Sequence, residues 1–315
     1  MTHRPRNKVA SGGVPRPTLP VVFDLRYHVA SLTAVFVALV MGILVGVGLS
    51  GKGFVNDAER DNLTSQIAGL QQDVDASRES LGSAARVEEA LRRFADETYP
   101  TVVPGRLSGK RVAVLFVGPI DGGTAFSVGK AVGDAGGTVV RTRSIGVPLE
   151  TQAVQDVLKR QTVFGQLRGV GHLDDLGRTL AREVVRGGTT PLWDALGETI
   201  VLERKGPSAT PADAVVVVRT AGTQRGLTRD FLAGVYAGLA RSGTPAIGVE
   251  PSGSGSSALP AFVVGGLSTV DSVDTSPGRL ALVLLLGGAA PGRYGIGESA
   301  DDGILPPVGP PSAQG

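Results

Sequence analysis

The sequence predicts an α/β protein with a single N-terminal transmembrane helix, a coiled-coil helix after it, and a doubly wound parallel sheet of the Rossmann or flavodoxin type. Three observations predict this architecture. Residues 29–49 contain no charged side chain, a heptad spacing of apolar residues follows, and from residue 111 onward short apolar runs alternate with helical patterns. Strands that alternate with helices are typical of a parallel sheet covered on both faces.

The uncharged segment has the length of a membrane span. Twenty-one residues in a helix reach about 30 Å, the thickness of a bilayer's hydrocarbon core. A buried core helix would keep a polar face, and here only Ser31 and Thr33 are polar, so we assign residues 23–50 to a transmembrane anchor. A cleaved signal peptide is the remaining alternative, although its apolar region would run only about 7 to 15 residues.

Charges on the two sides of this segment predict its orientation. Five Lys and Arg but only one Asp precede residue 29, whereas Lys52 is soon followed by Asp57 and Glu59. Positive charge marks the cytoplasmic side of a membrane protein. We therefore expect a single-pass cell-membrane protein with a disordered basic cytoplasmic tail at residues 1–22 and an extracytoplasmic C-terminal domain.

The calculated isoelectric point near 9.0 comes from the tail. Beyond residue 28, 26 Lys and Arg face 28 Asp and Glu, so the rest of the chain is slightly acidic. The basic tail favours membrane lipid as a partner, and nothing in the charge pattern favours a nucleic acid.

Small residues recur every four positions along the predicted membrane helix. This helix-packing set consists of Ala34, Ala38, Gly42 and Gly46. Residues at this spacing lie on one face of a helix, and small side chains there let two backbones approach closely. The pattern favours self-association of the helix. Gly is also frequent throughout a chain with 46 glycines, and this frequency is the competing explanation.

Residues 55–97 predict a coiled coil. Apolar residues alternate in steps of four and three, and the predicted seam consists of Leu63, Ile67, Leu70, Val74 and Leu81. Together with the small-residue face, this seam predicts a homodimer. The alternative is an amphipathic helix that folds back on its own globular domain.

The following residues predict a hinge at 98–109, an α/β domain at 110–297 and a disordered tail at 298–315. Predicted strands are 111–117, 138–144, 199–203, 214–219, 245–250 and 261–264. One predicted helix ends near residue 135, and the others are 151–160, 173–186 and 228–241. The apolar run 279–286 could be a final strand or a buried helix.

Catalytic and metal-binding motifs are lacking. The chain has no cysteine, and His172 is the only histidine beyond the membrane segment, so thiolate sites and a Ser-His-Asp triad lack their residues. The loop after the first strand, with Gly118, Asp121, Gly122 and Gly123, is the candidate ligand loop because a doubly wound fold binds ligands there. It matches neither GxGxxG nor a P-loop. We expect no enzyme activity, no cofactor, and no catalytic or metal residues.

Two stretches resemble a known family. The run FDLRYHVASLTAVFVALVMGILVGVGL from Phe23, and the later Ser276-Pro277-Gly278-Arg279, are similar to the actinobacterial MctB-type copper transporter family, described as copper transport outer membrane proteins. The resemblance covers about residues 23–297. It implies a role in copper transport or homeostasis, with copper as a possible partner.

A closely similar protein, SteB, implies a second function. In that role the chain would pair with a SteA-like protein on the cytoplasmic side and promote peptidoglycan hydrolysis by a separate enzyme during cell separation. One membrane helix cannot enclose a pore unless it oligomerises, so the residues themselves favour a dimeric scaffold over direct transport.

Overall fold

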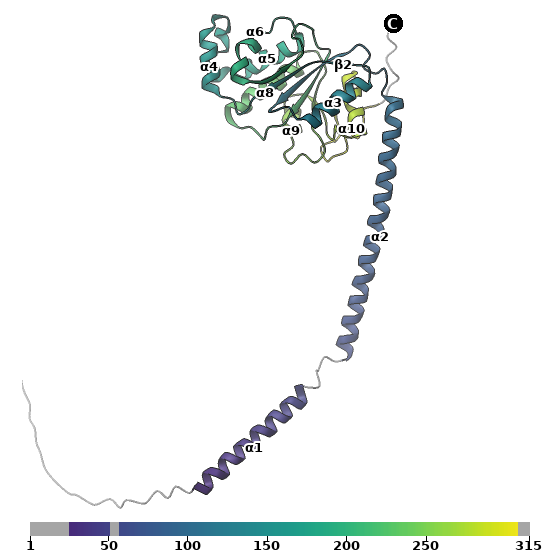
Figure 1. Cartoon of the computed structure of the whole chain (residues 1–315), viewed down its shortest axis with the longest axis vertical. Coiled ribbons are helices and arrows are strands. Elements are labelled where there is room, and N and C mark those ends of the chain that lie inside the picture. Colours follow the sequence, from purple (N-terminus) through teal and green to yellow (C-terminus); the bar gives the residue numbers. More distant parts are fainter. Residues whose placement is uncertain (1–24, 51–56, 308–315) are drawn as a thin grey trace, which may run out of the picture. The chain divides into compact units, whose positions relative to one another are not determined.

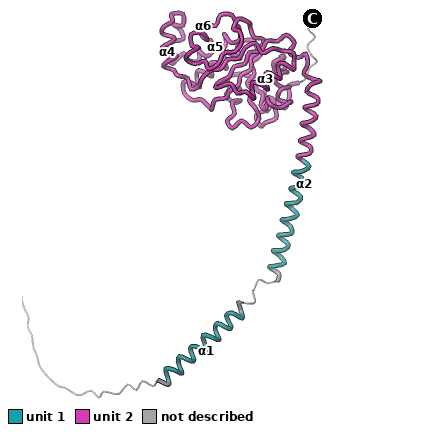
Figure 2. Tube along the Cα trace, viewed as in Figure 1, with its two compact units in different colours: residues 1–83 teal, residues 84–315 magenta. Residues whose placement is uncertain are grey.

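The computed structural model describes residues 25–50 and 57–307, with side chains from 27 to 48 and from 59 to 307. The chain divides into two compact units, residues 1–83 and 84–315, and each is described by itself (Figure 1 and Figure 2). The predicted cytoplasmic tail at residues 1–22 lies outside the described residues.

The first unit begins with α1 (Leu25–Ser50), one continuous apolar helix. Its stretch Tyr27–Gly48 has a mean hydropathy of 2.5 and is the one candidate membrane span among the described residues. Thr33 Oγ1 donates a hydrogen bond to the Val29 carbonyl at 2.7 Å, so this polar group is satisfied inside the helix. The predicted N-terminal membrane helix is thus present as a candidate anchor.

Helix α2 (Asp57–Val102) covers the predicted coiled-coil segment and continues five residues beyond its expected end. The prediction placed a hinge here because Pro100, Pro104 and Gly105 are typical of a break between elements. Pro100 nevertheless lies inside the helix, in its last turn, where its missing N–H removes one helix hydrogen bond. The predicted hinge therefore begins inside α2, and its side chains Tyr99, Val103 and Leu107 are buried in the domain.

Seven strands form the sheet of the second unit. Their order is β3-β2-β1-β4-β5-β6-β7, with β3 antiparallel to β2 and all other neighbours parallel. From β1 the chain first adds strands on one side of the sheet and then, from β4 onward, on the other side, as a doubly wound sheet requires. The strands are β1 (Arg111–Val117), β2 (Thr138–Ile145), β3 (Val201–Lys205), β4 (Ala214–Arg219), β5 (Ala246–Val249), β6 (Ser268–Val270) and β7 (Arg293–Tyr294).

Helices cover both faces of the sheet (Figure 1). One face packs against α4 (Thr151–Arg160), α5 (Leu173–Arg186), α6 (Pro191–Ala195), α8 (Gly226–Ala240) and α9 (Leu259–Val264). The other packs against α3 (Gly122–Asp134), α10 (Ser276–Leu286) and the end of α2. Alternate residues of β1 enter the two cores, which is the period-2 geometry of a strand buried on both faces. Short elements α7 (Gly197–Ile200), η1 (Thr162–Leu167) and η2 (Val170–His172) complete the fold.

One predicted strand is wrong, one strand was missed, and one open alternative is decided by the structure. Residues 261–264, predicted as a strand, belong to helix α9, which Pro260 opens at a position where a helix needs no N–H. The neighbouring strand is β6, which the prediction missed. The ambiguous run 279–286 is helical and lies within α10.

The end of the domain also extends beyond the predicted boundary. Residues 298–307, predicted as the start of a disordered tail, fold against the domain: Asp302 accepts a hydrogen bond from the Arg293 N–H at 2.8 Å, and Pro306 is buried. Residues 308–315 lie outside the described residues.

Candidate functional site

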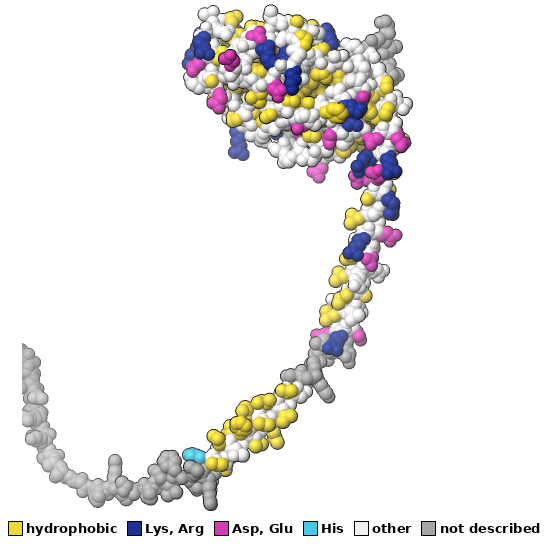
Figure 3. All heavy atoms as spheres, in the orientation of Figure 1, with side chains coloured by type: hydrophobic (Ala, Val, Ile, Leu, Met, Phe, Trp, Pro, Cys, Tyr) yellow, Lys and Arg dark blue, Asp and Glu magenta, His cyan; other side chains and the backbone are white. Residues whose placement is uncertain are grey.

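A stripe of exposed apolar side chains runs along α2. All five predicted seam residues point to solvent, with exposed fractions from 46% at Val74 to 69% at Leu81. Figure 3 shows these apolar side chains recurring along the helix between charged ones. Exposed apolar residues scattered singly are ordinary, but a row of them at heptad spacing marks an interaction surface. None of the described residues covers the seam within the first unit.

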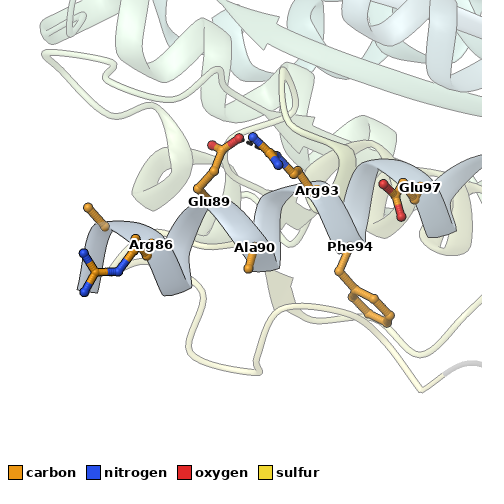
Figure 4. Close-up of a pocket in the computed structure, with 7 residues that line it drawn as sticks. Arg86, Glu89, Ala90, Arg93, Phe94 and Glu97 are labelled. Atoms are coloured by element: carbon orange, nitrogen blue, oxygen red, sulfur yellow. Dashed lines mark hydrogen bonds and ion pairs between the residues drawn. The ribbon is translucent and has the colours of Figure 1, made fainter. Parts of the chain in front are cut away.

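Shallow hollows lie on this helix. In the first unit, Ile67, Leu70 and Val74 line one together with Gln71, Asp75 and Arg78. In the second unit, another hollow of about 630 Å³ lies between Arg86 and Glu97 (Figure 4). There the Glu89–Arg93 ion pair, at 2.8 Å, points to one side of the helix, while Ala90 and Phe94 point to the other. Phe94 is 68% exposed, so apolar surface continues past the predicted seam.

The last turns of α2 are fixed to the domain by the residues Ser276-Pro277-Gly278-Arg279. Ser276 Oγ donates a hydrogen bond to Asp96 of α2 at 2.5 Å. The Arg279 guanidinium lies over the Tyr99 ring at 5.1 Å from its centroid and donates to Ser276 Oγ at 2.8 Å. A cation over an aromatic face is attracted by the ring's quadrupole. We call these residues, Asp96, Tyr99, Ser276 and Arg279, the α2 clamp.

The other two residues of the motif allow the clamp to form. Pro277 lies in the first turn of α10, where its missing N–H costs nothing. A Cβ on Gly278 would lie 2.1 Å from the Ser272 carbonyl oxygen, so only glycine permits this approach. Thr275 caps the helix by accepting the Gly278 N–H at 3.2 Å. The motif is therefore a helix start shaped to contact α2.

Tyr99 is buried within the clamp, close to Asp134 and Arg279. Burial raises the pKa of its hydroxyl to about 12, with the Asp134 carboxylate adding to the increase and Arg279 opposing it. The phenol therefore stays protonated at neutral pH. The Tyr99 ring contributes to the core as an apolar surface and to the clamp as a partner for Arg279.

The candidate ligand loop is closed by a neighbouring segment. Gly118 has a φ of +107°, and a Cβ there would lie 2.6 Å from Thr220 Oγ1. Thr220 Oγ1 donates to the Pro119 carbonyl at 2.6 Å, so the loop after β4 fills the point where strand order reverses.

The remaining residues of the candidate ligand loop begin helix α3. Asp121 caps α3 by accepting the Thr124 N–H at 2.7 Å and the Thr124 hydroxyl at 2.8 Å, bonds that lower the pKa of Asp121. Gly122 and Gly123 are the first residues of α3. A structural role accounts for all four residues, and their ligand role stays a prediction.

Among the described residues, the side chains that could bind copper do not assemble into a site of three or more ligands. Within residues 25–50 and 57–307, no group of three or more His, Cys, Asp or Glu side chains lies close enough to hold a metal ion. His172 Nδ1 lies 3.4 Å from Asp175, whose carboxylate also accepts a hydrogen bond from Arg178 at 2.6 Å. Copper prefers imidazole and sulfur ligands, so the described residues do not fit this metal.

The small-residue face of α1 is unobstructed within its own unit. Nothing lies within 4 Å of a Cβ placed on Gly42 or Gly46, and Ala34 and Ala38 are exposed on the same continuous helix. The four residues therefore share one open face, and its role in helix packing stays a prediction.

Comparison with known proteins identifies the family. A family model described as "Copper transport outer membrane protein, MctB" matches residues 22–305. The chain belongs to the MctB family. Proteins named "Copper transporter MctB" from Mycobacterium tuberculosis and Mycobacterium bovis are 28% identical to it over 89% of this chain and 98% of theirs. The protein of that name from Mycobacterium leprae is 28% identical over 90% of this chain and 100% of its own length.

The MctB match includes α1, α2 and the whole α/β domain, so the α2 clamp lies inside the matched region. Sequence reasoning marked Ser276-Pro277-Gly278-Arg279 as a family feature without assigning it a contact. It missed Asp96 and Tyr99 as partners because they lie about 180 positions earlier in the chain. It also missed Thr220, which closes the candidate ligand loop.

Proposed function

We propose that this MctB-family chain is a membrane-anchored, non-enzymatic scaffold of the cell envelope that works as a homodimer. The exposed seam of α2 is the observation that supports the proposal most directly. An α-helix with an unpaired apolar stripe gains by burying it, and a second copy offers the same stripe at the same height above the membrane. The small-residue face of α1 supplies a second contact between copies in the bilayer.

The attachment of α2 supports a mechanical role for the dimer. A helix that ends in a flexible hinge would leave the domain free to turn, whereas the buried Tyr99 and the clamp hold the last turns of α2 against α10. Dimerisation of the helix would therefore set the orientation of the attached domain. This arrangement suits a protein that presents a folded domain to envelope partners.

We place the N-terminus in the cytoplasm and the α/β domain outside, following the charges that flank α1. The cytoplasmic tail would then be available to a SteA-like partner, and the outer domain to a peptidoglycan hydrolase. The closed loop at Gly118 and the lack of a catalytic motif support a domain that binds without catalysing a reaction.

Direct copper handling is the second candidate, because the relatives named above are called copper transporters. Under the scaffold proposal, any copper phenotype arises through proteins that this chain organises. Under direct handling, the chain itself would bind the ion as substrate.

The decisive experiment measures the mass of the full chain in nanodiscs. Substituting Ile67→Glu with Leu70→Glu would bury carboxylates in the seam, a cost of several kcal/mol, so we expect the dimer to weaken at least about a hundredfold. Gln72→Glu, on the opposite face of the same helix, is the matched control and should leave the dimer intact.

A dimer and partner binding that both survive the double substitution would contradict the scaffold proposal. Copper titration of the same samples by calorimetry separates the two candidates. We expect no stoichiometric binding, and one tightly bound ion per chain would establish direct handling instead.

A further inference from the structure

A groove of about 960 Å³ lies on the sheet face covered by α5, α8 and α9. It includes Arg219, the last residue of β4, and Thr223 in the loop that follows, so it reaches the carboxyl edge of the sheet. Doubly wound folds bind ligands at this edge. The apolar part of the wall comes from Leu232, Tyr236, Pro260 and Val264. We call it the Tyr236 groove, and its size is typical of small-molecule sites.

Three buried hydrogen-bond donors of groove-lining residues have no partner among the described residues. They are the Tyr236 hydroxyl, Arg219 Nε and Arg178 Nε. The Arg178 guanidinium is already paired with two carboxylates, so Tyr236 and Arg219 are the donors that await an acceptor. Tyr236 is only 3% exposed, and its ring is fixed by an edge-on contact with Phe262 at 5.0 Å. A buried donor without an acceptor costs roughly 1–3 kcal/mol, so native proteins rarely leave two of them beside one groove without an occupant.

The charges around the groove leave one cation without a counter-ion. Arg219 donates to the carbonyls of Ser257 at 2.8 Å and Ser256 at 3.4 Å, but it makes no ion pair with any described residue. The other charged side chains of the groove are paired. Arg178 bonds Asp174 at 2.8 Å and also Asp175, and Arg229 bonds Asp230 at 2.8 Å.

The protonation state of Tyr236 matches this arrangement. Burial raises the pKa of its hydroxyl well above the ordinary value, and the nearby Arg219 charge only partly opposes the increase. At neutral pH the phenol is therefore a hydrogen-bond donor, and Arg219 lies close enough to influence it. Both donors can serve a single acceptor group.

We propose that the Tyr236 groove binds a small monocarboxylate with an apolar body. The two carboxylate oxygens would accept from the Tyr236 hydroxyl and Arg219 Nε, and the single negative charge would balance Arg219. The apolar body would lie along Leu232, Pro260 and Val264. Polyanions fit less well because Asp174 and Asp230 also line the groove.

The test measures binding of 4-phenylbutyrate, a soluble monocarboxylate, to the full chain in nanodiscs. Binding is detected by saturation-transfer NMR, and empty nanodiscs are the blank. The neutral analogue 4-phenylbutyramide keeps the apolar body without the charge. Charge-assisted hydrogen bonds are about twice as strong as neutral ones, so we expect the carboxylate to bind at least about tenfold more tightly.

Substitutions in the groove localise the binding. Arg219→Gln and Tyr236→Phe should each weaken 4-phenylbutyrate at least about fivefold, because each removes one donor to the carboxylate. Val264→Glu provides a test that does not touch the core, since Val264 is 88% exposed and the added negative charge would repel the ligand. Arg182→Gln is the matched control, and it should change the affinity less than about twofold because Arg182 is exposed and does not line the groove.

Three results would overturn the proposal. They are equal affinity for the acid and the amide, no displaceable binding of either, and binding that survives both Val264→Glu and Arg219→Gln. Because the dimer is measured separately by mass, failure of the groove proposal would leave the scaffold proposal intact.

Discussion

The two ends of α2 place their apolar side chains in opposite environments. Near its start, Leu63, Ile67 and Leu70 are more than half exposed, whereas just beyond its end Val103 and Leu107 are fully buried. Yet these residues belong to one class, aliphatic side chains on or beside one helix. The difference teaches that burial follows from what the rest of the chain supplies. The domain covers the end of α2, and under the scaffold proposal a second copy covers the start.

The largest effect on stability is expected from a substitution at the buried end of α2. Leu107→Ala removes a fully buried side chain and should lower the free energy of unfolding by about 2–5 kcal/mol. Leu81→Ala makes the same chemical change at a side chain that is 69% exposed in the single chain. In the Ile67→Glu, Leu70→Glu background, where the seam is unpaired, it should cost the domain less than about 0.5 kcal/mol. Denaturant titration of the full chain in nanodiscs, followed by Trp193 fluorescence, measures both. Equal losses would show that the two ends do not differ.

The next effect tests the α2 clamp. Arg279→Ala removes the contact over Tyr99 and the hydrogen bonds to Ser276 Oγ and to the Asp274 carbonyl, so we expect a loss of about 1–3 kcal/mol. Arg92→Ala is the control: its ion pairs, at 3.6 and 3.7 Å, are exposed on α2. Exposed ion pairs contribute about 0–1 kcal/mol. Hydrogen exchange of residues 95–102 should increase in the first variant alone.

A smaller effect concerns the ion pair between Arg111, which begins β1, and Asp213, which precedes β4. Arg111 hydrogen-bonds Asp213 and lowers the pKa of that carboxyl to about 2. The ordinary pKa of an Asp carboxyl in the unfolded chain is near 3.9. At a pH between these two pKa values, the unfolded state therefore binds more protons than the folded state. Stability from this pair is therefore complete above about pH 4 and is lost as the pH falls towards 2.

The substitution Asp213→Asn tests this pH dependence. The variant should be less stable than the native chain at neutral pH, and this difference should shrink as the pH falls from 4 to 2. Denaturant midpoints measured across that range provide the test. A difference that stays constant with pH would show that the Asp213 charge plays no part.

The smallest effect is expected in the membrane helix. Gly42→Ile places a branched side chain on the small-residue face and should raise the dimer dissociation constant roughly three- to tenfold. Gly48→Ile is matched in chemistry but lies off that face, and it should have little effect. Mass measurements in nanodiscs compare the two variants. If both behave alike, helix packing does not use this face.

Local patterns predicted much of this fold. Strand β1 and helices α4 and α5 begin and end where the sequence placed them. The strand is a near-continuous apolar run, and the two helices show a clean helical period with clear boundary residues. Strand β6 escaped prediction because three residues are too short to show a period. Residues 261–264 looked like a strand because β-branched and aromatic residues also fill a short buried helix beside Pro260.

The candidate sites were less predictable because they depend on contacts between distant residues. Asp96 and Ser276 are 180 positions apart, and no local pattern links them. The Gly118 loop had the sequence position of a ligand site, but Thr220, about a hundred residues away, fills the space. The exposed apolar stripe of α2 was predictable because it depends only on residue spacing within one helix, and its role as a coiled-coil seam stays a prediction.

The continuity of α2 has a consequence for how stability depends on expression. One helix carries both the exposed seam and the clamped end, so any free energy released by pairing the seam also opposes release of the last turns from the domain. By mass action, a contact available only to the folded chain raises its stability as the concentration of partners rises. The melting temperature of the domain should then increase with the surface density of the protein in the membrane. A higher surface density would raise the free energy of unfolding of each domain, and a lower density would reduce it.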